Sequence, residues 1–198
     1  MTNNAYYKIL HDVPQIPEDL LHSKDFEDAL TRSKSLQVPS GGGYVRPDGS
    51  SIAPEILSRE IPKNLEQWIN QNVCSLTNNS VIYRKLAVND KSNFYPPHID
   101  TKRTHTLLYN IVDSGGELVF WKEKNKPIFR GAPVGPHVVT DYTQLEELCR
   151  IKSPYKTWYI INSRVIHSVE NLSGVRESIQ ISCQVTDKIV ADSLIMGV

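Results

Sequence analysis

Polar and apolar residues alternate along the segment from Arg176 to Val185. Because successive side chains of an extended strand point to opposite faces, this pattern predicts a strand with one polar and one apolar face. The polar face begins with Arg176, Ser178 and Gln180. The apolar face carries Ile179, Ile181, Cys183 and Val185. Arg176 can bind a ligand only if the polar face turns into the protein, and on the outside it would be an ordinary surface charge.

The chain from residue 81 onward is rich in β-branched and aromatic residues separated by turn residues, and it predicts further strands. The segments with this composition are 81–88, 95–100, 104–112, 117–121, 157–162 and 165–169. The turn at 113–116 predicts a hairpin between the two strands beside it. We expect the last two segments to form a second hairpin. Lysines and prolines in residues 122–139 predict an irregular loop with short strands.

Before residue 81, apolar residues recur mainly at helical spacing. We predict one or two short helices in 17–36, a short helix at 53–57 with a proline in its first turn, and a longer helix at 62–73. The apolar stripe of the longer helix should pack on the outside of a sheet and consists of Leu65, Trp68, Ile69 and Val73. A further helix is predicted at 145–150, because residues 141–144 have the form of a capping box.

Two segments before residue 81 have neither pattern. Residues 1–16 are expected to supply an edge strand or an arm. Residues 38–50 include three consecutive glycines, Gly41–Gly43, and predict a loop. Consecutive glycines can cradle phosphate when a helix follows directly, but no helical pattern follows here. Near the mouth of a barrel, such a loop could instead cover a substrate.

Length and charge restrict the class of protein. A chain of 198 residues with 12 prolines suits one domain with a sizeable core. Lysine and arginine total 22, and aspartate and glutamate also total 22. The balance leaves no overall field that would attract nucleic acid or a membrane surface. We therefore expect neither partner, and the oligomeric state is left open.

The cysteines indicate a reducing compartment. Cys74, Cys149 and Cys183 are odd in number, widely spaced and without a CxxC pair, which argues against a disulfide framework and a structural zinc site. The first residues lack a charged region followed by an apolar run, and no stretch approaches the about 20 apolar residues of a membrane span. We expect a soluble, cytoplasmic protein.

Candidate metal ligands lie in two distant segments. His98 and Asp100 are two positions apart, so in an extended strand both side chains point to the same face. A third ligand must come from another strand, and His167 is the candidate. Two histidines and one carboxylate on one face of an ion form the set that holds ferrous iron and leaves the other face open for oxygen. Arg176 follows nine residues after His167 and suits a bidentate grip on a carboxylate.

Each of these residues also has an ordinary interpretation. The three ligand candidates could form a hydrogen-bonded polar cluster in a jelly-roll. His105 competes for the metal if it faces inward, although a histidine in such a strand more often packs in the core. The remaining histidines lie in loop or helical contexts and are expected in solvent: His11, His22 and His137. The aromatic residues expected in the core or a pocket wall are Trp121, Trp158 and Tyr159.

The ordered pattern of His-x-Asp, a distal histidine and Arg-x-Ser resembles the iron(II)- and 2-oxoglutarate-dependent dioxygenases. Residues 95–100 and 115–120 look most like the prolyl 4-hydroxylase-type branch of that superfamily. The resemblance implies a mainly β fold with flanking helices and a double-stranded β-helix (jelly-roll) core. The resemblance covers residues 81–186, which would be the oxygenase core. In the single domain, 1–198, we expect helical and loop support at 1–80 and a C-terminal tail at 187–198.

The same resemblance implies roles for individual residues. His98, Asp100 and His167 would hold Fe(II) and form the catalytic centre. Arg176, helped by Ser178, would bind the far carboxylate of 2-oxoglutarate. A tyrosine often completes that grip in the family, and the candidates in order of preference are Tyr109, Tyr83 and Tyr95.

The resemblance implies an enzyme that uses Fe(II), O₂ and 2-oxoglutarate to hydroxylate or otherwise oxidise an unactivated C–H bond, releasing succinate and CO₂. Positive residues near the ligand strands could hold a carboxylate, which suggests a small-molecule substrate such as an amino acid or a related metabolite, although they could equally be rim charges. They are Lys102, Arg103 and Arg164. Two alternatives stay open: a peptidyl, prolyl-type substrate, and a cupin-like domain that binds metal without catalysis.

Overall fold

A computed structural model describes residues 6–32, 44–45, 51–52, 55–77, 79–87, 94–100, 103–125, 137–138, 142–184 and 186–193. The predicted Gly41–Gly43 loop and Lys102 lie outside these ranges. Among the described residues, no helix has the length and apolar composition needed to cross a bilayer.

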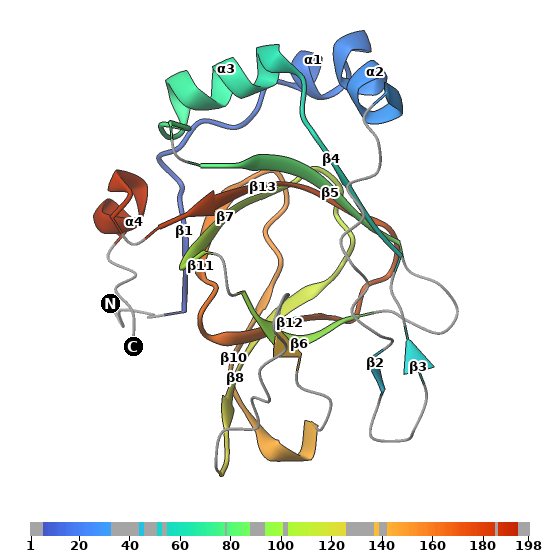
Figure 1. Ribbon diagram of the computed structural model, residues 1–198, viewed down its shortest axis with the longest axis vertical. Coiled ribbons are helices and arrows are strands. Elements are labelled where there is room, and N and C mark those ends of the chain that lie inside the picture. Colours follow the sequence, from blue (N-terminus) through green and yellow to red (C-terminus); the bar gives the residue numbers. More distant parts are fainter. Residues whose placement is uncertain are drawn as a thin grey trace.

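Two antiparallel sheets face each other and form the body of the protein (Figure 1). The first sheet has six strands, in the order β1 (Tyr7–Ile9), β11 (Trp158–Asn162), β7 (His105–Asn110), β13 (Arg176–Cys183), β5 (Val81–Ala87) and β4 (Glu55–Arg59). The second has five strands, in the order β10 (Leu145–Lys152), β8 (Glu117–Glu123), β12 (Ile166–Glu170), β6 (Tyr95–Ile99) and β9 (His137–Val138). The predicted mainly β fold with a jelly-roll core is confirmed.

Most consecutive strands of this core alternate between the two sheets, although β8, β9 and β10 all lie in the second. β5, β7, β11 and β13 belong to the first sheet, and β6, β8, β10 and β12 belong to the second. The two predicted hairpins are therefore wrong, because β7 and β8 lie in different sheets, as do β11 and β12. Each short connection crosses the sandwich instead of folding a strand back on its neighbour. This crossing brings residues from distant parts of the sequence to facing positions between the sheets.

Three helices cover the outer face of the six-stranded sheet (Figure 1). They are α1 (Glu18–Leu21), α2 (Lys24–Arg32) and α3 (Lys63–Asn72), while α4 (Lys188–Ser193) follows the last strand. Leu65 and Ile69 of α3 are fully buried in one cluster with Ile179 and Ile181 of β13. The predicted packing of the 62–73 helix on the outside of a sheet is confirmed, and its apolar stripe closes one face of that sheet.

The predicted helix at 145–150 is wrong. Residues 142–144 form a single 3₁₀ turn, and β10 then pairs with β8 along its whole length. The register shifts between Glu147 and Cys149, which marks a β-bulge. The capping-box form is a local feature of residues 141–144, whereas the pairing of β10 with β8 is a long-range contact that it does not reveal.

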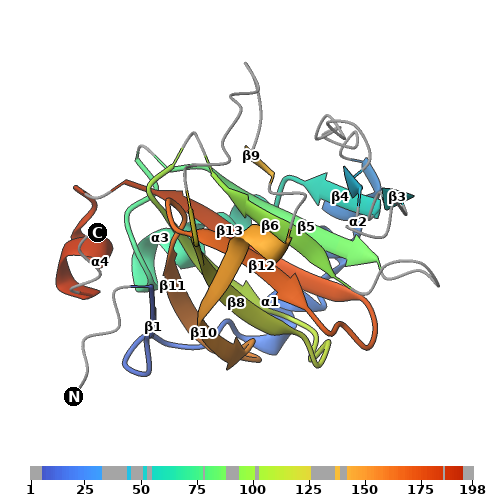
Figure 2. The ribbon, with the colours of Figure 1, turned by 90° about the horizontal axis from the view of Figure 1, so that it is seen from below.

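The predicted helix at 53–57 is also wrong, since Glu55–Arg59 is β4 at the edge of the first sheet. Its backbone pairs with β5 from Glu55↔Ala87 to Arg59↔Tyr83. The proline signal is local, whereas this pairing depends on a strand more than twenty residues later in the sequence. At the opposite edge, β1 pairs with β11 and confirms the edge strand expected in residues 1–16. Figure 2 shows the two sheets from below, with β10, β8 and β12 side by side.

Candidate metal centre

The two candidate histidines lie directly opposite each other on neighbouring strands of the five-stranded sheet. His98 is in β6 and His167 in β12, and the antiparallel register pairs them. Their ring centroids are 4.3 Å apart. Asp100 follows the end of β6, where its backbone N–H donates to Ser163 O at 2.9 Å. One ligand atom from each of the three side chains lies within 4.8 Å of the others.

Both imidazoles are held in the same way by their own strands. His98 Nδ1 is 2.9 Å from Pro96 O, and His167 Nδ1 is 2.9 Å from Val165 O. A carbonyl oxygen can only accept a hydrogen bond, so each Nδ1 must carry the proton. The lone pair is then on Nε2 of each ring. Hydrogen bonds of this kind fix the tautomer and orientation of a metal-binding histidine.

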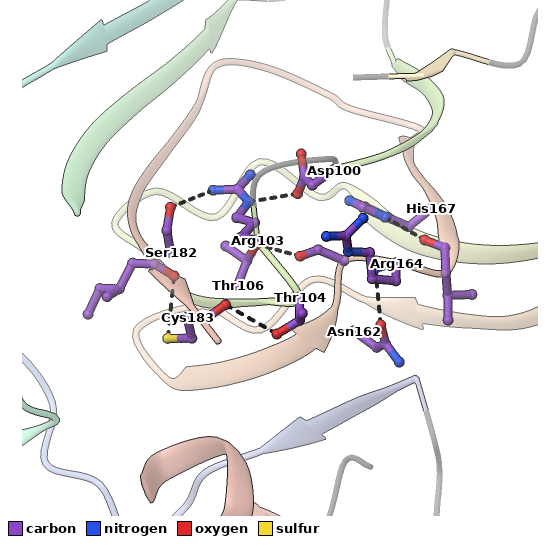
Figure 3. Close-up of polar contacts among 12 residues, drawn as sticks. Asp100, Arg103, Thr104, Thr106, Asn162, Arg164, His167, Ser182 and Cys183 are labelled. Carbon is purple, nitrogen blue, oxygen red and sulfur yellow. Dashed lines mark hydrogen bonds and ion pairs between the residues drawn. The ribbon is translucent and has the colours of Figure 1, made fainter. Parts of the chain in front are cut away.

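Arg103 orients the carboxylate of the cluster. Its Nε donates to Asp100 Oδ2 at 2.7 Å, and its Nη1 donates to Ser182 Oγ at 3.4 Å. Figure 3 shows the guanidinium between these two groups. Both side chains of the ion pair are mostly buried, with 13% and 14% of their surface exposed. With Oδ2 held by Arg103, the other carboxylate oxygen can bind a metal ion.

The electrostatics of the cluster favour the protonation states that a metal needs. Burial lowers the pKa of His98 to about 3, and the neighbouring His167 acts in the same direction. Burial also lowers the pKa of His167. For Asp100, burial alone would raise the pKa, but Arg103 and the two histidines outweigh it and hold the pKa below its ordinary value. At neutral pH the site therefore holds two neutral imidazoles and one carboxylate.

A pocket of about 550 Å³, counting its opening, lies beside the cluster and is lined by both sheets. The polar face of β13 turns into it, because Arg176, Ser178 and Gln180 all line the pocket. The predicted alternation of β13 is confirmed by the apolar face, which packs in the cluster beneath the helices. Arg176 Nη2 donates to Tyr159 Oη at 3.0 Å, while its buried Nε has no partner among the described residues.

The structure does not place the preferred tyrosine near Arg176. Tyr109 is the register partner of Ile179 and belongs to the cluster under the helices, so it is on the opposite face of the sheet from the pocket. Tyr83 belongs to the same cluster and packs against Phe26. The prediction that Tyr109 or Tyr83 faces the Arg176 site is therefore wrong, because the alternation of side chains along their strands points both to the outer face.

Two other tyrosines lie on the pocket side. Tyr95 lines the pocket and contacts the His98 ring edge to face, with centroids 4.6 Å apart. Tyr159, whose hydroxyl accepts from Arg176, pairs with Leu108 and so shares the inward face of its sheet. Sequence reasoning placed Tyr159 only in the core or a pocket wall. β11 reads Trp-Tyr-Ile-Ile-Asn and is buried on both faces, so its composition gives no signal for which side chains point inward.

The positive residues near the ligand strands differ in position. Arg103 lines the pocket and forms an ion pair with Asp100. Arg164 is exposed in the turn after β11, where its backbone N–H donates to Asn162 Oδ1 at 3.0 Å (Figure 3). Lys102 is outside the described residues. Of the two described residues, Arg103 and Arg164, the structure brings Arg103 to the pocket.

His105, His11 and His22 are not part of the cluster. His105 is buried, but it pairs in register with Cys183 of the outward-facing cluster, and its Nδ1 is 3.0 Å from Thr104 Oγ1. This agrees with a packing role. His11 and His22 are exposed as expected, whereas the side chain of His137 is not among those described.

Comparison with known proteins identifies the fold. No family model matches the chain, and no curated protein matches it. Among solved structures, the chain is similar to the non-heme alpha ketoglutarate dependent carbocyclase SnoK from nogalamycin biosynthesis, with a TM-score of 0.51, 10% sequence identity and coverage of 88% of this chain and 78% of that one. The chain thus has the fold of a non-heme α-ketoglutarate-dependent enzyme, and the resemblance stated from its motifs is confirmed at the level of the fold.

Two weaker matches were also found. The epimerase SnoN, described as non-heme and alpha ketoglutarate dependent, matches at a TM-score of 0.47 and 12% identity, covering 89% of this chain and 78% of that one. A Pseudomonas putida prolyl-4-hydroxylase matches at a TM-score of 0.44 and 13% identity, covering 89% and 91%. At these values neither match bears on the chemistry of this chain.

Proposed function

We propose that this protein is an Fe(II)- and 2-oxoglutarate-dependent oxygenase that oxidises a C–H bond of a small molecule. The observation that carries the proposal is the convergence of His98, Asp100 and His167, whose ligand atoms lie within 4.8 Å of one another at the wall of an internal pocket. Two imidazoles and one carboxylate are the donors of the facial set that binds ferrous iron and leaves coordination positions open.

The donor set fits such an ion in detail. Both imidazoles donate a hydrogen bond from Nδ1 to a backbone carbonyl, so their Nε2 lone pairs are available. The carboxylate of Asp100 has one oxygen held by Arg103. A mixed nitrogen and oxygen set without thiolate suits iron better than a structural zinc site. His98, Asp100 and His167 would therefore hold Fe(II).

The pocket also has a group suited to the far carboxylate of 2-oxoglutarate. Arg176 is 7% exposed, its Nε is unpaired among the described residues, and Ser178 is on the same face two residues later. A buried guanidinium without an acidic partner is unfavourable unless a ligand supplies one. Arg176 and Ser178 would bind that carboxylate, and Tyr159 would fix the guanidinium from behind.

With iron bound, the chemistry is the coupled oxidation in which O₂ converts 2-oxoglutarate to succinate and CO₂ and delivers its second oxygen atom to the substrate C–H bond. The chain contributes position and exclusion of water. Arg103 keeps the Asp100 carboxylate turned toward the ion site, and the β6 and β12 carbonyls keep both imidazole rings in place. The apolar walls, Leu86, Leu108, Leu118, Ile161 and Val169, restrict water around the reacting groups.

An anaerobic titration tests the proposal without knowledge of the substrate. Fe(II) is added to the metal-free protein, then 2-oxoglutarate, and the visible charge-transfer absorption of the chelated 2-oxo acid is recorded. We expect the band in the wild type and no band in His167→Ala. If iron binds but 2-oxoglutarate produces no band and does not tighten iron binding, the protein is a non-catalytic metal-binding jelly-roll.

A further inference from the structure

Three arginines line the described part of the pocket, and the proposed chemistry gives a role to Arg103 and Arg176 but none to Arg84. It is in β5, directly opposite Ser178 of β13, and it lines the pocket together with Arg176. Directly opposed residues of an antiparallel pair share one face of the sheet. Arg84 therefore points to the same side as the residues proposed to bind 2-oxoglutarate.

The Nε of Arg84 is buried and has no hydrogen-bond partner among the described residues. Burial lowers the pKa of this guanidinium below its ordinary value; Tyr95 and Asp100 oppose the shift, and Arg103 and Arg176 add to it. A guanidinium that is partly withdrawn from water and beside two others is unfavourable unless an anion binds there.

The charge of the loaded pocket would stay positive. Its described lining contains three guanidiniums, Arg84, Arg103 and Arg176, and no carboxylate, although Asp100 pairs with Arg103 from beside it. Together with Fe(II), these arginines supply five positive charges, whereas Asp100 and 2-oxoglutarate supply three negative ones. The chain as a whole has zero formal net charge, so this excess is local to the pocket.

The position of Arg84 is beside the proposed cosubstrate contact. Arg176 is at one end of the polar face of β13, and Ser182, which accepts from Arg103, is toward the other end. Arg84 faces Ser178, one alternate position further along from Arg176, which is about 7 Å at the rise of an antiparallel strand. It therefore adjoins the Ser178 end of the proposed carboxylate site, toward the Asp100 side of the metal cluster, and the test must distinguish the two ligands.

The pocket opens to solvent, and its space of about 550 Å³ includes that opening. We propose that Arg84 binds a carboxylate of the primary substrate, so that the pocket selects small molecules bearing an acidic group. This inference rests on the proposed function and adds the chemical class of its substrate.

The first arm of the test asks whether Arg84 belongs to the 2-oxoglutarate site. Arg84→Gln is expected to fold, because it removes a buried unpaired charge, and Arg84→Lys keeps the charge as a matched control. In the anaerobic charge-transfer titration, we expect the Kd for 2-oxoglutarate to change less than about threefold in Arg84→Gln and to rise at least about tenfold in Arg176→Gln. Equal losses in both variants would assign Arg84 to 2-oxoglutarate and overturn the proposal.

The second arm measures anion binding with formate as the probe and formamide as its uncharged counterpart. Calorimetric titrations use the anaerobic full-length protein with Fe(II) and saturating 2-oxoglutarate. We expect formate but not formamide to bind wild type and Arg84→Lys, with at least about tenfold weaker binding in Arg84→Gln. Absence of formate binding in wild type, or equal binding in Arg84→Gln, would refute the anion site.

The two proposals fail in different ways. Loss of the charge-transfer band in wild type would count against the oxygenase, whatever formate does. If the band forms and formate binding does not depend on Arg84, the oxygenase stands and the acidic substrate does not. Far-ultraviolet circular dichroism of each variant confirms that these differences arise in folded protein.

Discussion

The two faces of the six-stranded sheet are buried to the same degree but differ in chemistry. On β13, Ser178 and Gln180 of the inner face are 1% and 4% exposed, and Ile179 and Ile181 of the outer face are both 0% exposed. The outer face packs on α3 and its neighbours, and its polar atoms are few, such as Trp158 Nε1, which donates to Pro14 O at 3.0 Å. The inner face buries guanidinium nitrogens without partners among the described residues. On β13, burial alone therefore does not distinguish the two faces, whereas the polar and charged side chains of the inner face do.

The largest expected effect is the loss of Fe(II) binding, and it should distinguish His167 of the cluster from His105, a buried histidine outside it. His167→Ala should abolish Fe(II) binding, because one of three ligands is lost, whereas His105→Ala should retain it. Anaerobic equilibrium dialysis with Fe(II) measures both affinities. Iron binding by His167→Ala at the wild-type affinity would contradict the assigned ligand set.

The next effect compares how the two faces of β13 contribute to the free energy of unfolding. Ile179→Ala removes a fully buried side chain from the cluster under the helices and should lower the free energy of unfolding by about 3 kcal/mol. Its neighbour on the inner face, Ser178, accepts a hydrogen bond from Gln180 Nε2, and Ser178→Ala should cost about 1 kcal/mol. Urea denaturation gives both values. Equal losses would mean that the two faces contribute alike to stability.

Arg176→Gln tests the inner face for ligand binding. Loss of a charge-assisted pair should weaken 2-oxoglutarate by about 10- to 100-fold, which corresponds to about 1.5–3 kcal/mol. Tyr109→Phe is the control on the outer face and should leave the Kd unchanged. The Fe(II) charge-transfer titration measures both. A large effect of Tyr109→Phe together with a small effect of Arg176→Gln would reverse the assignment of the two faces.

The smallest expected effect concerns the residue behind Arg176. Tyr159→Phe removes one hydrogen bond to the guanidinium without removing its charge, and it should weaken 2-oxoglutarate about three- to tenfold, or about 1 kcal/mol. In Arg176→Gln the same change should have no further effect, because the two residues act through one contact. Additive losses in the double variant would show that Tyr159 acts independently of Arg176.

The sequence predicted those parts of the structure that depend on local spacing. The parity of β13 and the apolar stripe of α3 follow from periodicity within one element, and both were right. The His98 and Asp100 pair needed only the geometry of an extended strand. The choice of His167 needed the ordered motif as well, because its register with His98 is a long-range pairing.

The failures share a physical cause, which is pairing between distant strands. Tyr109 was chosen without its register to Ile179, and that register decides which face it occupies. The helix at 145–150 was predicted from the capping-box form of residues 141–144, without the pairing of β10 with β8. The connection between β7 and β8 is short enough for a hairpin, and nothing in its composition reveals that it crosses to the other sheet.

The alternation of strands between two sheets also has a consequence for synthesis on the ribosome. β6 carries His98 and emerges well before β12, which carries its register partner His167, and β13 with Arg176 comes later still. A nascent chain that ends before β12 holds only part of the proposed ligand set. If the three residues bind iron, metal loading would follow the arrival of β12 beside β6. Iron binding would then indicate that this pairing has formed.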